Sequence, residues 1–173
     1  MGEHLTTGRE RTEHQRTEHQ RIEHQRTERQ RTEHERVEHE RVEQERNVEV
    51  VRRYLRTFVT KDLVELRAVV AEDVQIYGSG TAVRGRHHVE QAVASPGLTV
   101  VDLALVEIFP AGDRVTVSLA LTYRRDATGA TAVQSVCKMY RLAGGRIVQF
   151  WGEQDLYGLL RGLDMLPDVP IRF

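Results

Sequence analysis

A disulfide framework, a long apolar run and a surplus of charge are all missing from this sequence. Its 173 residues include a single cysteine, Cys137, so we expect no disulfides and a cytoplasmic location. No apolar run approaches the ~20 residues needed to cross a bilayer, and we expect no secretory signal. Because the formal net charge is only −1, we expect neither nucleic acid nor an anionic membrane as a partner.

The composition changes sharply near residue 46. Residues 1–46 carry ten arginines and twelve acidic residues, with almost no aliphatic side chains. The remaining stretch of about 127 residues is long enough to bury one hydrophobic core. We therefore predict a charged arm over residues 1–46 and one globular domain over residues 47–173.

Seven near-copies of a five-residue unit fill the arm from Arg11 to Glu45, beginning with RTEHQ and ending with RVEQE. In a helix each unit turns about 500°, so equivalent positions spiral around the axis and form no apolar seam for a coiled coil. Pairs such as Glu13 with Arg16, or Arg31 with Glu35, would stabilise a solitary helix. A solvated helix and a disordered, charge-balanced tail are the two alternatives, and the repeat identifies no partner for the arm.

Most of the histidines lie in the arm and suggest a metal site at first sight. Two histidines that bind one ion on a helix are spaced four residues apart. In the arm the common spacing is five, which turns neighbours about 140° apart. We therefore expect no metal site, with a pH-sensitive arm as the alternative, because histidine has a pKa of about 6.5. The six residues are His4, His14, His19, His24, His34 and His39.

Two helices are expected to open the globular part. Asn47 interrupts the repeat and is expected to cap the first, and Asp62 to cap the second. Helical spacing places a set of apolar side chains on the inner face of the first helix, with Tyr54 at its edge. The inner set of the first helix is Val48, Val51, Leu55, Phe58 and Val59, and that of the second is Leu63, Leu66, Val69 and Val70.

Strand patterns dominate the rest of the chain. We predict strands over 74–77, 81–84, 99–109, 114–124, 131–142 and 146–151, a helix over 86–94, and a last leucine-rich helix opened by Asp155. This order predicts an α+β fold with helices on one side of a bent antiparallel sheet. One face of strand 114–124 carries only Thr116, Ser118, Ala120 and Thr122, which favours a homodimer formed through the sheet.

Three stretches resemble the nuclear transport factor 2-like superfamily, and within it the SnoaL-like polyketide cyclases and ketosteroid isomerases. They are Val51–Leu55 with Lys61–Leu63 and Ala71–Val74, then Val83–Arg86, and finally Tyr140–Ile147 running on to Trp151 and Asp155. The resemblance covers about residues 48–167. It implies a cone-shaped curved antiparallel sheet packed against N-terminal helices, a cystatin-like roll, around a pocket for a small hydrophobic molecule. Most members of the superfamily need no cofactor, so none is expected.

The resemblance also assigns site positions. The oxyanion-hole tyrosine of the isomerases falls on Tyr54, whereas their base and second acid fall on Gly78 and Lys138. The aspartate of the SnoaL-like cyclases falls on Gly152, which Glu153 follows directly, and Asp155 fits their next acidic position.

We accordingly predict catalytic and substrate-binding residues. Lys138 alternates with Val136 and Tyr140, so it should share their face of the sheet. Asp155 also suits a simple helix N-cap, and His87 and His88 are expected to be exposed. The catalytic candidates are Tyr54, Lys138, Glu153 and Asp155, and the substrate-binding candidates are Phe58, Ile76, Leu119, Leu121, Tyr140 and Trp151.

Two functions are compatible with these residues. The first is an enzyme of secondary metabolism that carries out cofactor-independent proton transfer, such as cyclisation, isomerisation or dehydration, on a hydrophobic molecule. The second is a non-catalytic ligand-binding or dimeric assembly module of the same fold. The missing aspartates and the long arm favour the second function, whereas analogy with the fold favours the first, which is the one we expect.

Overall fold

The structure, a computed structural model, describes residues 6–78 and 80–166 of the chain. The chain divides into two compact units, with the division between Val42 and Glu43. Helix α1, Thr6–Thr60, contains the entire five-residue repeat. None of the helices in the described part of the chain is both long enough and apolar enough to cross a membrane.

Ion pairs along the exposed surface of the first unit explain why its repeat is helical. Glu33 Oε1 lies 2.7 Å from Arg36 Nη2, and Arg31 Nε lies 2.9 Å from Glu35 Oε1. Each pair is largely solvated and contributes only about 0.2–0.5 kcal/mol, so the helix depends on the repetition of such pairs. Val37, at the apolar position of its unit, is 51% exposed, as expected for a helix without a buried seam.

Asn47 does not begin a new helix, contrary to the sequence prediction. α1 continues through this position, and the buried Asn47 side chain donates from Nδ2 to the backbone oxygen of Gly112, 3.3 Å away. An N-cap needs a backbone that leaves the helical conformation, and here the amide group instead binds a turn far along the chain. The buried stripe of α1 also differs from the prediction, because Val59 is exposed whereas Val50 and Tyr54 are buried.

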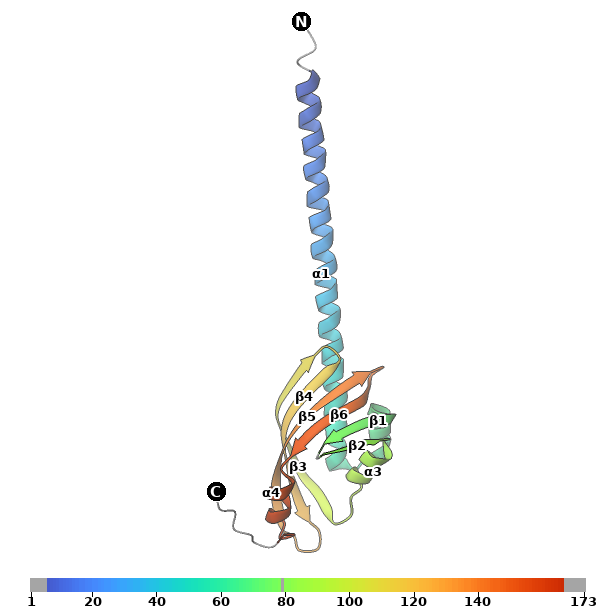
Figure 1. The fold of residues 1–173 in the computed structure, drawn as a ribbon, viewed down its shortest axis with the longest axis vertical. Coiled ribbons are helices and arrows are strands. Elements are labelled where there is room, and N and C mark those ends of the chain that lie inside the picture. The colour runs from blue at the N-terminus through green and yellow to red at the C-terminus, as the bar shows by residue number, and fades with distance from the viewer. Residues whose placement is uncertain (1–5, 79, 167–173) are drawn as a thin grey trace. The chain divides into compact units, whose positions relative to one another are not determined.

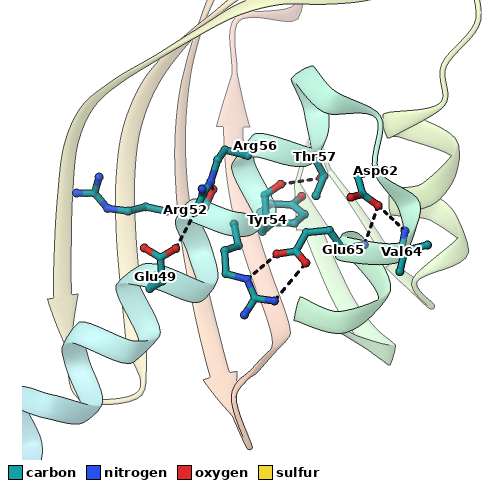
Figure 2. Close-up of polar contacts among 9 residues, drawn as sticks. Glu49, Arg52, Tyr54, Arg56, Thr57, Asp62, Val64 and Glu65 are labelled. Atoms are coloured by element: carbon teal, nitrogen blue, oxygen red, sulfur yellow. Dashed lines mark hydrogen bonds and ion pairs between the residues drawn. The ribbon is translucent and has the colours of Figure 1, made fainter.

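The second helix begins where the sequence predicts. α2 spans Leu63–Val69, and the Asp62 carboxylate accepts hydrogen bonds from the backbone N–H groups of Val64 and Glu65, at 2.9 and 3.0 Å (Figure 2). Glu65 in turn accepts a hydrogen bond from Arg53 Nη2 on α1, 3.2 Å away. These contacts fix the turn between the two helices, so that Tyr54 on α1 and Leu66 on α2 both enter the core.

One bent sheet makes up most of the second unit (Figure 1). Its spatial order is β2-β1-β6-β5-β4-β3, and every neighbouring pair is antiparallel except β1 with β6. The element order matches the prediction, although β1 begins four residues earlier than expected. The strands are β1 Val70–Gly78, β2 Thr81–Arg84, β3 Leu98–Ala111, β4 Arg114–Arg125, β5 Thr131–Ala143 and β6 Arg146–Gln154, and the later helices are α3 His87–Val93 and α4 Leu156–Gly162.

The inner face of the sheet carries the core. Val115, Val117, Leu119 and Leu121 of β4 are buried in one cluster with Val51, Tyr54 and Leu55 of α1, as the alternating pattern of β4 predicts. The opposite face of β4 holds the four small residues Thr116, Ser118, Ala120 and Thr122, which are half-buried. The homodimer through this face stays a prediction.

Candidate functional site

The concave side of the sheet and the helices enclose a pocket of about 360 Å³. Residues of α1, α3, α4 and all six strands contribute to its walls, and most of these side chains are apolar. The lining consists of Tyr54, Leu55, Phe58, Lys61, Ile76, Val83, His88, Val89, Ala92, Ser95, Leu98, Val100, Leu119, Leu121, Tyr123, Gln134, Val136, Lys138, Tyr140, Phe150, Gln154, Leu156 and Leu159. A pocket of this size and polarity suits a small hydrophobic molecule.

Four aromatic side chains form a cluster in the wall. The Tyr54 ring lies 5.4 Å from the ring of Phe58, 5.5 Å from that of Tyr140 and 6.2 Å from that of Phe150, between centroids. The first two contacts are edge-to-face, which is a favoured geometry for aromatic pairs. The cluster holds two phenol groups in fixed positions within an apolar wall.

Both phenols remain hydrogen-bond donors throughout the neutral pH range. Burial raises the pKa of Tyr54, and the neighbouring Tyr123 acts in the same direction. Burial also raises the pKa of Tyr140, with a further contribution from Tyr54. The Tyr140 hydroxyl is fully buried, and no described residue hydrogen-bonds to it. A buried donor without a partner costs free energy.

Lys138 brings an amine into the same region. It faces the pocket together with Val136 and Tyr140, as the alternation of β5 predicts. Its Nζ lies 5.6 Å from the centroid of the Phe150 ring, and it makes no hydrogen bond or ion pair with any residue that the structure describes. Burial lowers the pKa of Lys138, since an unpaired ammonium is poorly solvated in apolar surroundings.

The titratable groups of the pocket lining include bases and phenols but no carboxylate in the described residues. Its titratable side chains are lysines, tyrosines and one histidine, and no described residue of the lining is Asp or Glu. No group of three or more His, Cys, Asp and Glu side chains that could hold a metal ion occurs in the described part of the chain. The pocket therefore presents hydrogen-bond donors and an amine, which complement an oxygen atom that carries or develops negative charge.

The structure places two of the four predicted catalytic residues in the lining. Tyr54 and Lys138 lie there, whereas Glu153 and Asp155 lie outside it and are exposed. Asp155 serves as the N-cap of α4, accepting a hydrogen bond from the Gly158 N–H at 2.8 Å. The Asp155 carboxylate therefore starts the helix and is not one of the pocket groups.

Five of the six predicted substrate-binding residues line the pocket, namely Phe58, Ile76, Leu119, Leu121 and Tyr140. Trp151 is outside the lining and only half-buried, contrary to the expectation of a buried wall residue. Its ring stacks on Tyr77, 5.8 Å between centroids, and the Arg114 guanidinium lies 5.6 Å from it. Side chains alternate along β6, so Phe150 faces the pocket and its neighbour Trp151 faces away.

Phe150, Lys61 and Tyr123 line the pocket but were not among the predicted site residues. His88 was expected to be exposed and is instead half-buried in the wall. The composition of the sequence offered a signal that could have pointed to the lysines. Of the 25 lysines and arginines in the sequence, Lys61 and Lys138 are the only lysines, and both line the pocket.

Two glycines occupy positions where the resemblance places catalytic aspartates. A Cβ atom on Gly78 would lie 2.6 Å from the backbone oxygen of Gly152 on the neighbouring strand. A Cβ atom on Gly152 would lie 2.6 Å from Lys138 Cγ, which pairs directly across the ladder. Both distances are shorter than real contacts allow, so β1 and β6 approach closely and the Lys138 stem occupies the space above Gly152.

Introducing the aspartate of the isomerases at position 78 should therefore damage the protein. We expect Gly78→Asp to lower the free energy of unfolding by about 1–3 kcal/mol, because the added atoms meet backbone rather than a flexible side chain. Urea denaturation measures the change, and Ala82→Asp on the exposed strand β2 controls for the poor strand propensity of aspartate. Equal stability of the Gly78→Asp and wild-type proteins would contradict the close approach of the two strands.

Comparisons with known proteins identify the family of the domain and similar solved structures. The family model described as a SnoaL-like domain matches residues 51–150. No curated protein matches the chain. Among solved structures, the chain is similar to an LEH-like epoxide hydrolase of M. tuberculosis, with 17% identity, a TM-score of 0.61, and 70% of this chain and 91% of that one covered.

Two further solved structures are similar to this chain in fold. IdmH of Streptomyces antibioticus, a proposed polyketide cyclase, is 23% identical with a TM-score of 0.59, covering 68% of this chain and 98% of that one. A protein of Catenulispora acidiphila with a ketosteroid isomerase-like fold, in complex with trimethylamine, is 16% identical with a TM-score of 0.60, covering 68% and 94%. At these identities the likeness establishes the nuclear transport factor 2-like fold.

Proposed function

This chain belongs to the SnoaL-like domain family, and from that premise we propose that its pocket binds a small hydrophobic carbonyl compound and transfers a proton on it. The observation that carries the proposal is the composition of the pocket. Two lysines and three tyrosines contribute to an otherwise mostly apolar wall, and no described lining residue is a carboxylate. Such a set complements an enolate, the anion formed when a carbonyl compound loses an α-proton.

Each polar group has a role in this chemistry. The unprotonated amine of Lys138 removes the α-proton, because burial favours the neutral form of a lysine. The phenols of Tyr54 and Tyr140 donate hydrogen bonds to the carbonyl oxygen as negative charge develops there. The glycines at positions 78 and 152 exclude the carboxylate bases that the family resemblance would place there, so Lys138 is the base that the lining offers.

Removal of an α-proton is the first step shared by several reactions. Cyclisation by an aldol-type closure, isomerisation of a double bond and elimination of a β-hydroxyl group all pass through an enol or enolate, and none needs a cofactor. The proposed cyclase IdmH and the isomerase-like protein of Catenulispora acidiphila share the fold and favour this group of reactions. We propose that the protein carries out one of them in secondary metabolism.

Ligand binding without catalysis is the second candidate. The absence of Asp and Glu from the described lining favours it, because carboxylates act as the bases at the positions that the family resemblance assigns. In this case the phenols and Lys138 would only hold the oxygen atom of the ligand in place. The exchange experiment described next separates the two functions.

Hydrogen–deuterium exchange tests the proposal directly. Benzylacetone and benzoylacetone are incubated with the protein in D₂O, and NMR follows both the loss of their α-protons and saturation transfer from the protein. We expect exchange faster than with an equal concentration of urea-unfolded protein. Binding without accelerated exchange would establish the second candidate and contradict the enzymatic one.

A further inference from the structure

Lysine is scarce in this protein, and both of its lysines contribute to one pocket. The chain holds 23 arginines, none of which lines the pocket, and two lysines, both of which do. Arginine stays protonated in proteins, whereas a buried lysine can lose its proton. A pocket that required only a fixed positive charge for an anion would be served as well by the planar guanidinium group. The use of lysine therefore points to the chemistry of a neutral amine.

The surroundings of the two lysines differ. Lys61 Nζ donates a hydrogen bond to the backbone oxygen of Val93, 2.9 Å away, and Asp126 partly opposes the fall in its pKa that burial causes. Lys138 has no such partner among the described residues, and its Nζ lies 5.6 Å from the centroid of the Phe150 ring. The Lys138 amine is thus unengaged, while that of Lys61 is held by the backbone.

The position of Lys138 is set by its neighbour across the strands. Its stem lies directly over Gly152, where any larger residue would collide with Lys138 Cγ. This arrangement holds the stem against the β6 backbone and keeps the amine in the pocket beside Phe150. An unpaired amine in an apolar cavity is the environment in which lysine acts as a nucleophile.

We propose that Lys138 is a nucleophilic amine that forms an imine with an apolar aldehyde or ketone bound in the pocket. The inference rests on the proposed function for its pocket and its carbonyl ligand, and it gives the Lys138 nitrogen a bond to the substrate in place of the role of base. Tyr140 belongs to the same lining, and no described residue hydrogen-bonds to its buried hydroxyl.

The chemistry balances without any further reagent. The Nζ lone pair forms a bond to the carbonyl carbon, and the π electrons move to the oxygen, which takes up a proton to give a carbinolamine. The nitrogen then loses a proton, and the protonated hydroxyl leaves as water while the C=N bond forms. Addition of water reverses the sequence and releases the carbonyl compound.

Reductive trapping tests the proposal. Full-length protein is treated near neutral pH with benzylacetone or butanal and sodium cyanoborohydride, and the products are mapped by intact and peptide mass spectrometry. We expect one adduct on Lys138, with the mass of the carbonyl compound less its oxygen. Labelling of Lys138 should exceed that of Lys61, because Lys61 Nζ donates a hydrogen bond to the backbone oxygen of Val93 whereas Lys138 has no hydrogen-bond partner among the described residues.

A matched variant completes the design. Lys138→Arg, which retains the charge but offers no neutral amine, should lose the adduct. Because Lys61 and the α-amine report within the same wild-type molecule, the comparison does not depend on the folding of any variant. Labelling of Lys138 no faster than Lys61 with both probes would overturn the imine. Accelerated α-proton exchange without an adduct would overturn the imine alone, and an adduct without exchange would overturn only the proton transfer.

Discussion

Replacing Lys138 with methionine should slow the exchange of ketone α-protons by about 10²–10⁴-fold, the usual contribution of one positioned general base. Methionine has a similar length and no amine, so the pocket keeps its volume and loses its base. The wild-type rate should rise with pH while the amine deprotonates and level off below the ordinary lysine pKa of 10.5, because burial lowers the pKa of Lys138. The pH dependence is measured by NMR for both proteins.

Stability against pH provides the folding control for this variant. In the interval between the lowered pKa of folded Lys138 and the ordinary pKa near 10.5, the unfolded chain binds more protons than the folded one. Stability contributed by this group therefore increases as pH rises through that interval. At neutral pH Lys138→Met should be at least as stable as wild type, and its advantage should shrink as the pH approaches 10.5. A methionine variant that exchanges protons at the wild-type rate would exclude Lys138 as the base.

Replacing Tyr54 with alanine should lower the free energy of unfolding by about 3–5 kcal/mol, the cost of removing a large aromatic side chain from a core. The Tyr54 side chain is 1% exposed and contacts the rings of Phe58, Tyr140 and Phe150. Its loss would open a cavity beside the pocket and release the other rings of the cluster. Urea denaturation followed by near-ultraviolet circular dichroism measures the change.

Two matched variants separate packing from chemistry at this position. Tyr54→Phe keeps the ring and should cost about 1 kcal/mol or less, while slowing proton exchange because one oxygen-binding phenol is lost. Tyr157→Ala, at a tyrosine that is 42% exposed on α4, should be close to neutral. If Tyr54→Ala were as stable as Tyr157→Ala, the aromatic cluster would not be a part of the core.

The elements of the domain could be predicted because their signals are local. Asp62 and Asp155 were predicted as N-caps and act as such, since a cap depends on backbone N–H groups two or three residues away. The alternation along β4 and β5 likewise assigned Leu119 and Lys138 to the inner face. Asn47 failed as a cap because its amide group binds the backbone of Gly112, a contact that no local pattern announces.

The candidate site was only partly predictable, and β6 illustrates the reason. Resemblance drew attention to Trp151 and Glu153, yet in this strand the residues that face the pocket are those that alternate with them, Phe150 being the clearest case. A shift of one residue in the register of a strand moves every side chain to the opposite face of the sheet. A family motif alone therefore does not decide which side chains enter a cavity.

The sequence by itself determined the order of the elements and the family, because both depend on spacing along the chain. Only the tertiary structure decided that the two lysines meet in one pocket, that Gly152 makes room for the Lys138 stem and that the Tyr140 hydroxyl is left without a described partner. Those facts arise where β5, β6 and α1 come together across the sheet. Which atoms face one another at such a junction is set by strand register and packing, and these depend on residues far apart in the sequence.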